Sequence, residues 1–577
     1  MSSLQKSPIT FRRIVKSIGA ASAVVVAVLV TVLVLCPSAA ADTDFCNGGI
    51  LDAGAPLGTQ GPDLVIGPKV TCTVDGKVSQ TYNFHNVYIF GDGTPQGTAT
   101  LLFNNATMDF YAANILVQNG GILQATGIGA TGETLTIHLY GAPADPGVTC
   151  KKMNNGQVVD DDTCGVPTSN PDVWDSNKMD MQWPASCAKT SQLDPPTTLP
   201  GGVDDCFYQY GVFDSGDGAG AYFGLKVLAL SYGGAIQMSG YKGAQGGDDS
   251  NPAVLSSSWQ RLNSTLKGGV SESSLQISSP VTDWTYGDNI VVTATDYLPG
   301  HAEPLQVASA SGTTVNLIGP VQLPHWDQTY SLAGVPCNPL QGSTQCEIGP
   351  DLLLGQDPKD RNVDMRAAVG LLTRSIRIVS DGGGAGDKFD GYFGGHTLVR
   401  QGFLSYQIQG VEFYQLGQGG LKGHYPVHFH MARKTPQGTY VKDSSMWDSM
   451  TRWITVHATQ GVTLARNVGY LSIGHGFYLE DGSEANNVLN TNLGVFARAA
   501  IANSQNKRGV PGILARPGDP GAEIPPYHSD WDHPTVFWIM NGWNEFQYNF
   551  ASSAGTCGAC YWLLPGGHQW SVAIRVL

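Results

Sequence analysis

The sequence predicts an all-β protein whose C-terminal part is a right-handed parallel β-helix. Three observations lead to this prediction. The 577 residues include 73 glycines and only 14% charged residues, a composition that suits short strands joined by tight turns. Apolar strand patterns bounded by glycine, asparagine or aspartate recur, and long helical patterns are scarce. From Leu371 onward similar segments return roughly every 20–25 residues, the size of one β-helix coil.

The N-terminus has the pattern of an export signal. Basic residues ending at Lys16 precede an apolar run from Ile18 to Leu35, and small residues follow before Asp42. We expect cleavage after residue 41 and a secreted, extracellular protein. An uncleaved signal anchor, which would hold the protein at the cell surface, is the alternative, because the run approaches the length of a membrane span.

Cysteine usage fits an oxidising compartment. Ten of the eleven cysteines remain after Cys36, and they fall into couples that are close in the sequence. Nearest-neighbour pairing would join Cys46 with Cys72, Cys150 with Cys164, Cys187 with Cys206, Cys337 with Cys346, and Cys557 with Cys560. We interpret the last couple as a structural clamp rather than a redox pair, because no βαβ pattern surrounds it.

Charge excludes one class of partner. The formal net charge is −15, and about −19 without residues 1–41, which hold four basic and no acidic residues. Binding of nucleic acid needs clustered Lys and Arg, so we expect no nucleic-acid partner. An anionic ligand would need a local basic patch or a bridging cation.

Changes of pattern along the chain suggest four regions. Residues 1–41 are the signal segment. Residues 42–310 form a β domain, with a Cys-, Asp- and Pro-rich surface insertion at 142–222. Residues 311–370 are expected to be a loop-rich connector, and residues 371–577 to be the β-helix repeats.

Three segments set the expected register of the coils: Val427-His-Phe-His430, Ile454-Thr-Val-His457 and Phe477-Tyr-Leu-Glu480. Successive residues of a strand face opposite sides, so placing the apolar residues in the core turns the others outward. Adjacent coils are about 4.8 Å apart. The outward residues would then stack in two columns, one of His430, His457 and Glu480 and one of His428, Thr455 and Tyr478. Asn467 and Asn492, 25 positions apart, should stack in turns.

These columns are the candidate catalytic site. The assigned residues are His428, His430, His457, Tyr478, Glu480 and Asp481. Imidazoles act near neutral pH as acids, bases or metal ligands, and the carboxylates add acid–base chemistry. Nearby basic side chains are assigned to substrate binding: Lys422, His424, Arg433, Lys434 and His475. The alternative is a ladder of side chains that only stabilises the solenoid.

A metal is compatible with this patch but not required by it. Imidazole-rich ligation suits zinc or another transition ion, whereas calcium prefers oxygen. Asp530 and Asp532, on one face of an extended segment, are candidate calcium ligands or an acid–base pair. A solvated turn before Val536 is the alternative interpretation.

Several motifs carry a resemblance to a known family. Tyr425-Pro-Val-His-Phe-His430, Gly474-His-Gly-Phe477 and Leu479-Glu-Asp-Gly482 resemble the β-helix core of the G8-domain family. This family comprises the cell-migration-inducing and hyaluronan-binding protein, its transmembrane hyaluronidase relative and the fibrocystin-like proteins. Residues 47–141 with 226–310 resemble its G8 domain. The resemblance implies a G8-type β domain before a pectin-lyase-like β-helix, handling of hyaluronan or a similar acidic polysaccharide, and calcium dependence of the degrading members.

Two functions stay open at this point. We expect an enzyme, either a hyaluronidase-like glycosidase or a polysaccharide lyase. Hydrolysis would use carboxylates such as Glu480 or Asp481, and elimination would use a base beside a neutralised uronate. The alternative is a non-catalytic carbohydrate-binding, adhesion or receptor-like protein that holds sugar on the solenoid surface with the help of its aromatic residues: Trp447, Trp453, Trp538 and Trp543.

Overall fold

The computed structural model describes the chain in separate stretches. They are residues 45–142, 148, 151–154, 157–160, 223–331, 362–381, 392–419, 421, 423–480, 482–499, 533–555 and 558–563. The chain divides into two compact units, Met1–Ala40 and Ala41–Leu577, and every described residue lies in the second. The expected signal segment and most of the 142–222 insertion lie outside the described residues. No helix in the described stretches has the length and apolar character that crossing a membrane needs.

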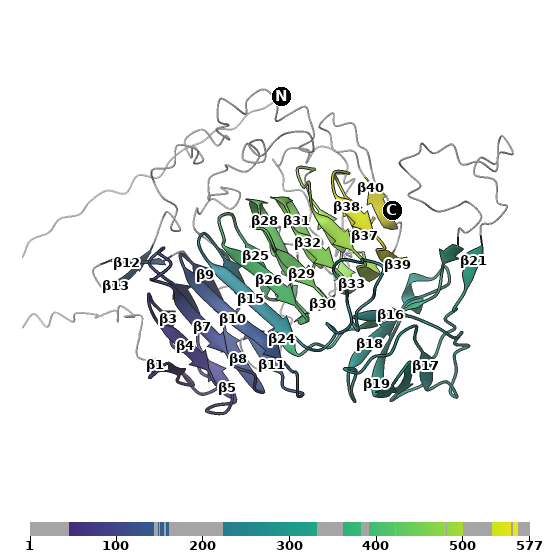
Figure 1. The fold of residues 1–577 in the computed structure, drawn as a ribbon, viewed down its shortest axis with the longest axis horizontal. Helices are drawn as coiled ribbons and strands as arrows, with labels where there is room; N and C mark the ends of the chain where they lie inside the picture. Colours follow the sequence, from purple (N-terminus) through teal and green to yellow (C-terminus); the bar gives the residue numbers. More distant parts are fainter. Residues whose placement is uncertain are drawn as a thin grey trace, which may run out of the picture. The chain divides into compact units, whose positions relative to one another are not determined.

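Three sheets form a parallel β-helix, because each coil adds one strand to each sheet (Figure 1). Within the described residues, ten strands form sheet 1: β3 (Leu64–Ile66), β6 (Asn86–Phe90), β9 (Asn114–Gln118), β14 (Val227–Leu230), β25 (His396–Val399), β28 (Val427–Lys434), β31 (Ile454–Gln460), β34 (Phe477–Leu479), β37 (Thr535–Ile539) and β40 (Ala559–Leu563). In Figure 1 the colour runs from purple at β3 to yellow at β40, so the coils stack in sequence order.

The other two sheets of the β-helix follow the same order. Among the described residues, eleven strands form sheet 2: β1 (Cys46–Asn47), β2 (Ile50–Leu51), β4 (Thr71–Val74), β7 (Ala99–Phe103), β10 (Gly121–Ile128), β15 (Ala235–Gly240), β26 (Ser405–Gln409), β29 (Tyr440–Lys442), β32 (Thr463–Ala465), β35 (Val488–Asn490) and β38 (Glu545–Gln547). Nine form sheet 3: β5 (Thr81–Asn83), β8 (Met108–Ala112), β11 (Leu135–Leu139), β24 (Ile376–Ser380), β27 (Val411–Tyr414), β30 (Ser445–Trp447), β33 (Val468–Ile473), β36 (Leu493–Arg498) and β39 (Phe550–Ala554).

An antiparallel sheet interrupts one coil between β15 and β24. Its strands are β16 (Trp259–Arg261), β17 (Ser274–Gln276), β18 (Asn289–Val292), β19 (Glu303–Ser311), β20 (Thr314–Leu317) and β23 (Ala368–Leu371), with a 3-10 turn at Pro299–His301. Two hairpins complete the elements: β12 (Lys151–Asn154) with β13 (Gln157–Asp160), and β21 (Thr329–Ser331) with β22 (Asn362–Asp364). The antiparallel sheet contacts the β-helix directly, since the Trp259 indole N–H donates to the Thr491 carbonyl at 2.8 Å.

The predicted register of the coils is confirmed. Val427 pairs with Ile454 and His430 with His457, and Ile454 pairs in turn with Phe477. The apolar members of these segments are buried in the main core of the β-helix: Val427, Phe429, Ile454, Val456, Phe477 and Leu479. Alternation along the strand therefore turns the polar members to the outer face of sheet 1, as expected from the sequence.

Stacked asparagines hold the turns between sheets 2 and 3, which confirms the expected pairing. The Asn467 amide Nδ2 donates to Asn492 Oδ1 at 2.9 Å, and Asn492 Nδ2 donates to Asn549 Oδ1 at 2.9 Å. The residue before each asparagine has a left-handed backbone, with φ of 54° at Arg466 and 57° at Thr491. The stacked asparagine side chains, which form a ladder along the turns, offset this strain. They form hydrogen bonds with backbone groups that have no partner in a neighbouring strand because the chain turns sharply there.

The β-helix extends further toward the N-terminus than the repeat in the sequence indicates. Strands from residues 50–139 and 227–240 belong to the same three sheets as those after Leu371. The expected connector at 311–370 contains β20 and most of β23, both in the antiparallel sheet. The early coils lack the repeated His motif that sets the later register, and alternation alone does not distinguish them from an ordinary sheet.

One expected cysteine pair is confirmed by the disulfide between Cys46 and Cys72. It joins the first strand of sheet 2 to β4, which pairs directly with β2. Cys560 is a thiol whose Sγ donates to the Ala551 carbonyl at 3.7 Å, and its expected partner Cys557 lies outside the described residues. The other expected pairs also fall outside them.

Candidate functional site

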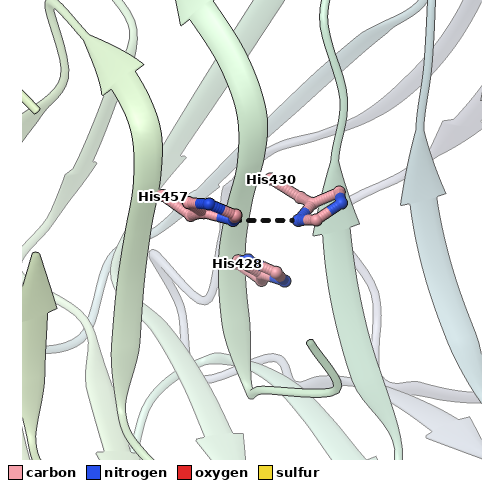
Figure 2. Close-up of side chains that lie close together, drawn as sticks. All are labelled: His428, His430 and His457. Carbon is pink, nitrogen blue, oxygen red and sulfur yellow. Dashed lines mark hydrogen bonds between the residues drawn. The ribbon is translucent and has the colours of Figure 1, made fainter. Parts of the chain in front are cut away.

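Three histidines converge on the outer face of sheet 1, where β28 and β31 lie side by side. His428 and His430 come from β28 and His457 from β31, and Figure 2 shows the three rings facing one another. One ring nitrogen from each lies within 4.8 Å of the others. The Nδ1 atoms of His430 and His457 are 3.4 Å apart. The structure thus brings together the three histidines that the register predicts.

A bend in both strands fixes these rings. Met431 and Ala458, which directly follow His430 and His457, have left-handed backbones with φ of 48° and 44°. The pairing of β28 with β31 shifts at the same point. The Glu484 carboxylate accepts a hydrogen bond from the Ala458 N–H at 2.8 Å, which stabilises the bend. Because the backbone turns immediately after each histidine, both rings lie where the straight part of the sheet ends.

His428 is buried, with 1% of its surface exposed. Its Nδ1 lies 2.7 Å from the Gly423 carbonyl, so Nδ1 carries the proton and donates it. The other ring nitrogen, Nε2, is buried and has no hydrogen-bond partner. Burial, followed by repulsion from His430 and His457, holds the pKa of His428 well below its ordinary value. The ring is therefore neutral, and its Nε2 lone pair is available to a ligand.

Glu480 adds a carboxylate to this cluster. Its Oε2 lies 4.0 Å from His457 Nδ1 and is buried without a hydrogen-bond partner. The side chain is 13% exposed, and that of His457 is 19% exposed. A carboxylate and an imidazole at this distance suit proton transfer to a reacting group placed between them.

Tyr478 belongs to a different group of side chains. Its ring stacks on His475 at 5.2 Å and on Trp538 at 5.8 Å, and the Arg452 guanidinium lies 3.8 Å from the ring centroid. His475 Nδ1 accepts a hydrogen bond from the Thr535 N–H at 3.2 Å, so it ties β34 to the next coil. The stack accounts for the packing of both residues, and their expected roles in chemistry and substrate binding stay predictions.

Neighbouring side chains cover the outward column of His428, Thr455 and Tyr478. All three point away from the core of the solenoid, yet they are 1%, 0% and 7% exposed. The rings of Tyr425 and Trp538 contact His428 and Tyr478, with centroids 4.8 and 5.8 Å away. Strand alternation gives the direction of a side chain but not what covers it.

The predicted substrate-binding residues are spread over several places. The His424 ring packs against the His396 ring with centroids 4.4 Å apart, and Lys434 is exposed at the end of β28. Arg433 lies in the same strand. Lys422, Asp481, Asp530 and Asp532 lie outside the described residues.

Two residues near the site were not predicted. Arg452 lies between the rings of Tyr425 and Tyr478, at 4.7 and 3.8 Å from their centroids, and bonds the Tyr425 hydroxyl. His396 is fully buried beside His424, and its pKa is held well below the ordinary value by that burial. Arg452 lies two residues before Ile454, the first residue of β31. That position is the signal that could have placed it beside the columns.

The donor atoms of the histidine cluster do not fit calcium. Calcium takes six to eight oxygen ligands, whereas the cluster offers three imidazole nitrogens and one nearby carboxylate. The candidate calcium ligands Asp530 and Asp532 lie outside the described residues. The expected calcium dependence stays a prediction.

Comparison with known proteins matches residues 392–569 to the family model described as CEMIP beta-helix. A G8 domain-containing protein of Dictyostelium discoideum is 29% identical over 65% of this chain and 22% of its own length. The human cell migration-inducing and hyaluronan-binding protein is 29% identical over 53% of this chain and 21% of its own. Human cell surface hyaluronidase CEMIP2 is 30% identical over 50% of this chain and 20% of its own length. The matched region thus spans between a fifth and a quarter of these relatives.

Among solved structures, the gp61 tailspike of Pseudomonas phage phi297 matches this chain. The match covers 56% of this chain and 48% of the tailspike chain. Its sequence identity is 10% and its TM-score is 0.15, and no functional inference follows from it.

Proposed function

We propose, from the match of residues 392–569 to the CEMIP beta-helix family model, that the protein is an extracellular enzyme that depolymerises an acidic polysaccharide of the hyaluronan type. The names of two relatives, a hyaluronan-binding protein and a cell surface hyaluronidase, support the substrate class. The disulfide between Cys46 and Cys72 supports an oxidising, extracellular location.

One observation supports the position of the reaction. Buried atoms without hydrogen-bond partners on the outer face of sheet 1 include Nε2 of His428, Oγ1 of Thr455 and Oε2 of Glu480. Of these, the His428 nitrogen and the Glu480 oxygen belong to groups that transfer protons or bind cations. Unpaired buried acceptors cost free energy, so natural proteins rarely keep them without a functional reason. The two side chains flank His457, which lies 4.0 Å from Glu480 and belongs to the same histidine cluster as His428.

In the proposed reaction Glu480 transfers the proton and the histidine cluster receives the acidic group of the sugar. Glycosidases protonate the leaving oxygen with a carboxylic acid, and lyases remove a proton beside a neutralised uronate. Glu480 serves either chemistry as the proton-transferring group. A positive centre is also needed, because the chain carries a net charge of −15 and His428 is neutral.

The test is product analysis of the secreted protein with hyaluronan, chondroitin and pectin. We expect shortening of an acidic polymer, and loss of a proton-transferring carboxylate should slow it by about 10²- to 10⁴-fold in Glu480→Gln. Glu545→Gln is the matched control, since Glu545 is an exposed glutamate on β38. Ultraviolet absorbance of the products distinguishes elimination from hydrolysis.

Polymers that keep their length in the presence of wild-type protein would refute an enzyme. If they are nevertheless retained by the immobilised protein, the non-catalytic binding function replaces it. Shortening that survives Glu480→Gln unchanged would move the reaction away from this site.

A further inference from the structure

We propose that His428, His430 and His457 bind a divalent transition-metal ion of the zinc class. This inference goes beyond the proposed function and does not rest on it, because metal binding is measured without any saccharide. It follows from the geometry of three side chains and from the hydrogen bonding of one of them.

The spacing of the ring nitrogens fits such an ion. Two imidazole nitrogens at 2.0–2.1 Å from a tetrahedral zinc ion are about 3.3 Å apart. The Nδ1 atoms of His430 and His457 are 3.4 Å apart. A nitrogen of His428 completes a group whose members all lie within 4.8 Å of one another.

His428 has the hydrogen bonding of a metal ligand. Metal-binding histidines commonly donate their second ring N–H to a carbonyl or carboxylate, which fixes the tautomer and the ring orientation. His428 donates from Nδ1 to the Gly423 carbonyl at 2.7 Å. This leaves Nε2, buried and without a hydrogen-bond partner, as the ring nitrogen whose lone pair a metal ion can use.

A purely structural histidine ladder accounts for less of the arrangement. One ring of the His430–His457 pair could donate a proton to the other across the 3.4 Å between them. That bond would still leave Nε2 of His428 buried and unpaired. A bound ion satisfies all three nitrogens at once, because each then donates a lone pair to it.

The same geometry selects against calcium and leaves room for a further ligand. Three nitrogen ligands suit zinc, cobalt, nickel or copper, whereas calcium requires oxygen. Three protein ligands leave one position of a tetrahedral ion open, as in catalytic zinc sites. Glu480 lies beside this centre, 4.0 Å from His457. The ion would also supply the positive charge that an acidic polymer needs.

The experiment is a metal titration of the full secreted chain after chelation and dialysis. Isothermal titration calorimetry with zinc chloride should show one tight site per chain, and calcium chloride should not fill it. Cobalt(II) should give the visible absorption band of a tetrahedral nitrogen-ligated ion. His457→Ala and His430→Ala should each weaken zinc binding by at least about 10- to 100-fold, the loss that removal of even an outer partner causes.

His301→Ala is the matched control, because His301 lies in the antiparallel sheet region and pairs with Asp296. Circular dichroism without metal identifies a variant that fails to fold. The cobalt spectrum of the wild-type chain needs no variant, so absence of the tetrahedral band alone overturns the inference. Zinc affinity equal in wild type and His457→Ala would also overturn it, as would calcium binding that depends on these histidines.

Discussion

Replacing Asn492 by alanine tests whether the asparagine ladder fixes the coils that carry the site. Asn492 is fully buried between coils. Its Oδ1 accepts from the Asn467 backbone N–H at 3.1 Å and from Asn467 Nδ2 at 2.9 Å. Its Nδ2 donates to the Leu464 carbonyl and to Asn549 Oδ1, both at 2.9 Å. The coil that leads to Asn467 carries His457, and the coil that leads to Asn492 carries Glu480.

The expected cost is large because the substitution leaves buried partners unsatisfied. Each buried polar group without a partner costs about 1–3 kcal/mol. The Asn467 N–H loses its Asn492 partner, and the ladder is cut between Asn467 and Asn549. We therefore expect a loss of roughly 2–5 kcal/mol in the free energy of unfolding, in the range for a broken buried network.

Urea unfolding followed by tryptophan fluorescence measures this change, and hydrogen exchange locates it. Stacked coils stabilise mainly their neighbours, so lost protection should centre on β31–β36. Asn490→Ala is the matched control, since Asn490 donates at 3.2 Å to the exposed Glu545 and should cost under about 1 kcal/mol. An Asn492→Ala protein within about 0.5 kcal/mol of wild type would refute the ladder argument.

Further predictions concern packing and pH. Gly469→Ala should destabilise the protein by about 1–3 kcal/mol in thermal unfolding, because its Cβ would lie 2.2 Å from Trp453 Cε3. Gly67→Ala should not destabilise the protein, because no atom lies within 4 Å of the added Cβ. Equal losses of stability in the two variants would contradict the packing argument. His396 is buried against His424 and its pKa is lowered, so the unfolded chain binds more protons. Stability should fall as pH drops below about 6.5, by up to about 1.4 kcal/mol per unit for this group. His396→Asn should flatten that slope in urea unfolding, and an unchanged slope would show that His396 titrates normally in the fold.

The register of the site could be predicted because two periods coincide in this part of the chain. Alternation along β28, β31 and β34 separates core residues from outer residues, and the coil repeat aligns His430 with His457. A slip by one residue would place Val427 and Phe429 outside, at the cost of their burial. The same reasoning found Asn467 and Asn492, since stacked turns require equivalent residues in successive coils.

Contacts between distant parts of the chain could not be predicted in this way. Arg374 is fully buried, and its guanidinium donates to the Asp443 carbonyl at 2.8 Å and to Ser258 Oγ at 2.8 Å. These partners are 69 and 116 residues away in the sequence. No local period links an arginine to such groups, so the junction between the antiparallel sheet and the β-helix emerges only from the three-dimensional arrangement.

His428 shows why the strand register alone could not predict the chemistry of the site. The sequence gives three histidines at positions that stack, and this pattern is equally compatible with a stabilising ladder and a metal centre. The Gly423 carbonyl distinguishes the metal centre from the ladder. It lies 2.7 Å from Nδ1 of His428, which fixes the proton on that nitrogen and leaves Nε2 as an acceptor. If the carbonyl faced Nε2 instead, the free lone pair would lie on Nδ1, on the other side of the ring. The turn that places one backbone oxygen therefore determines which nitrogen of His428 a ligand can use.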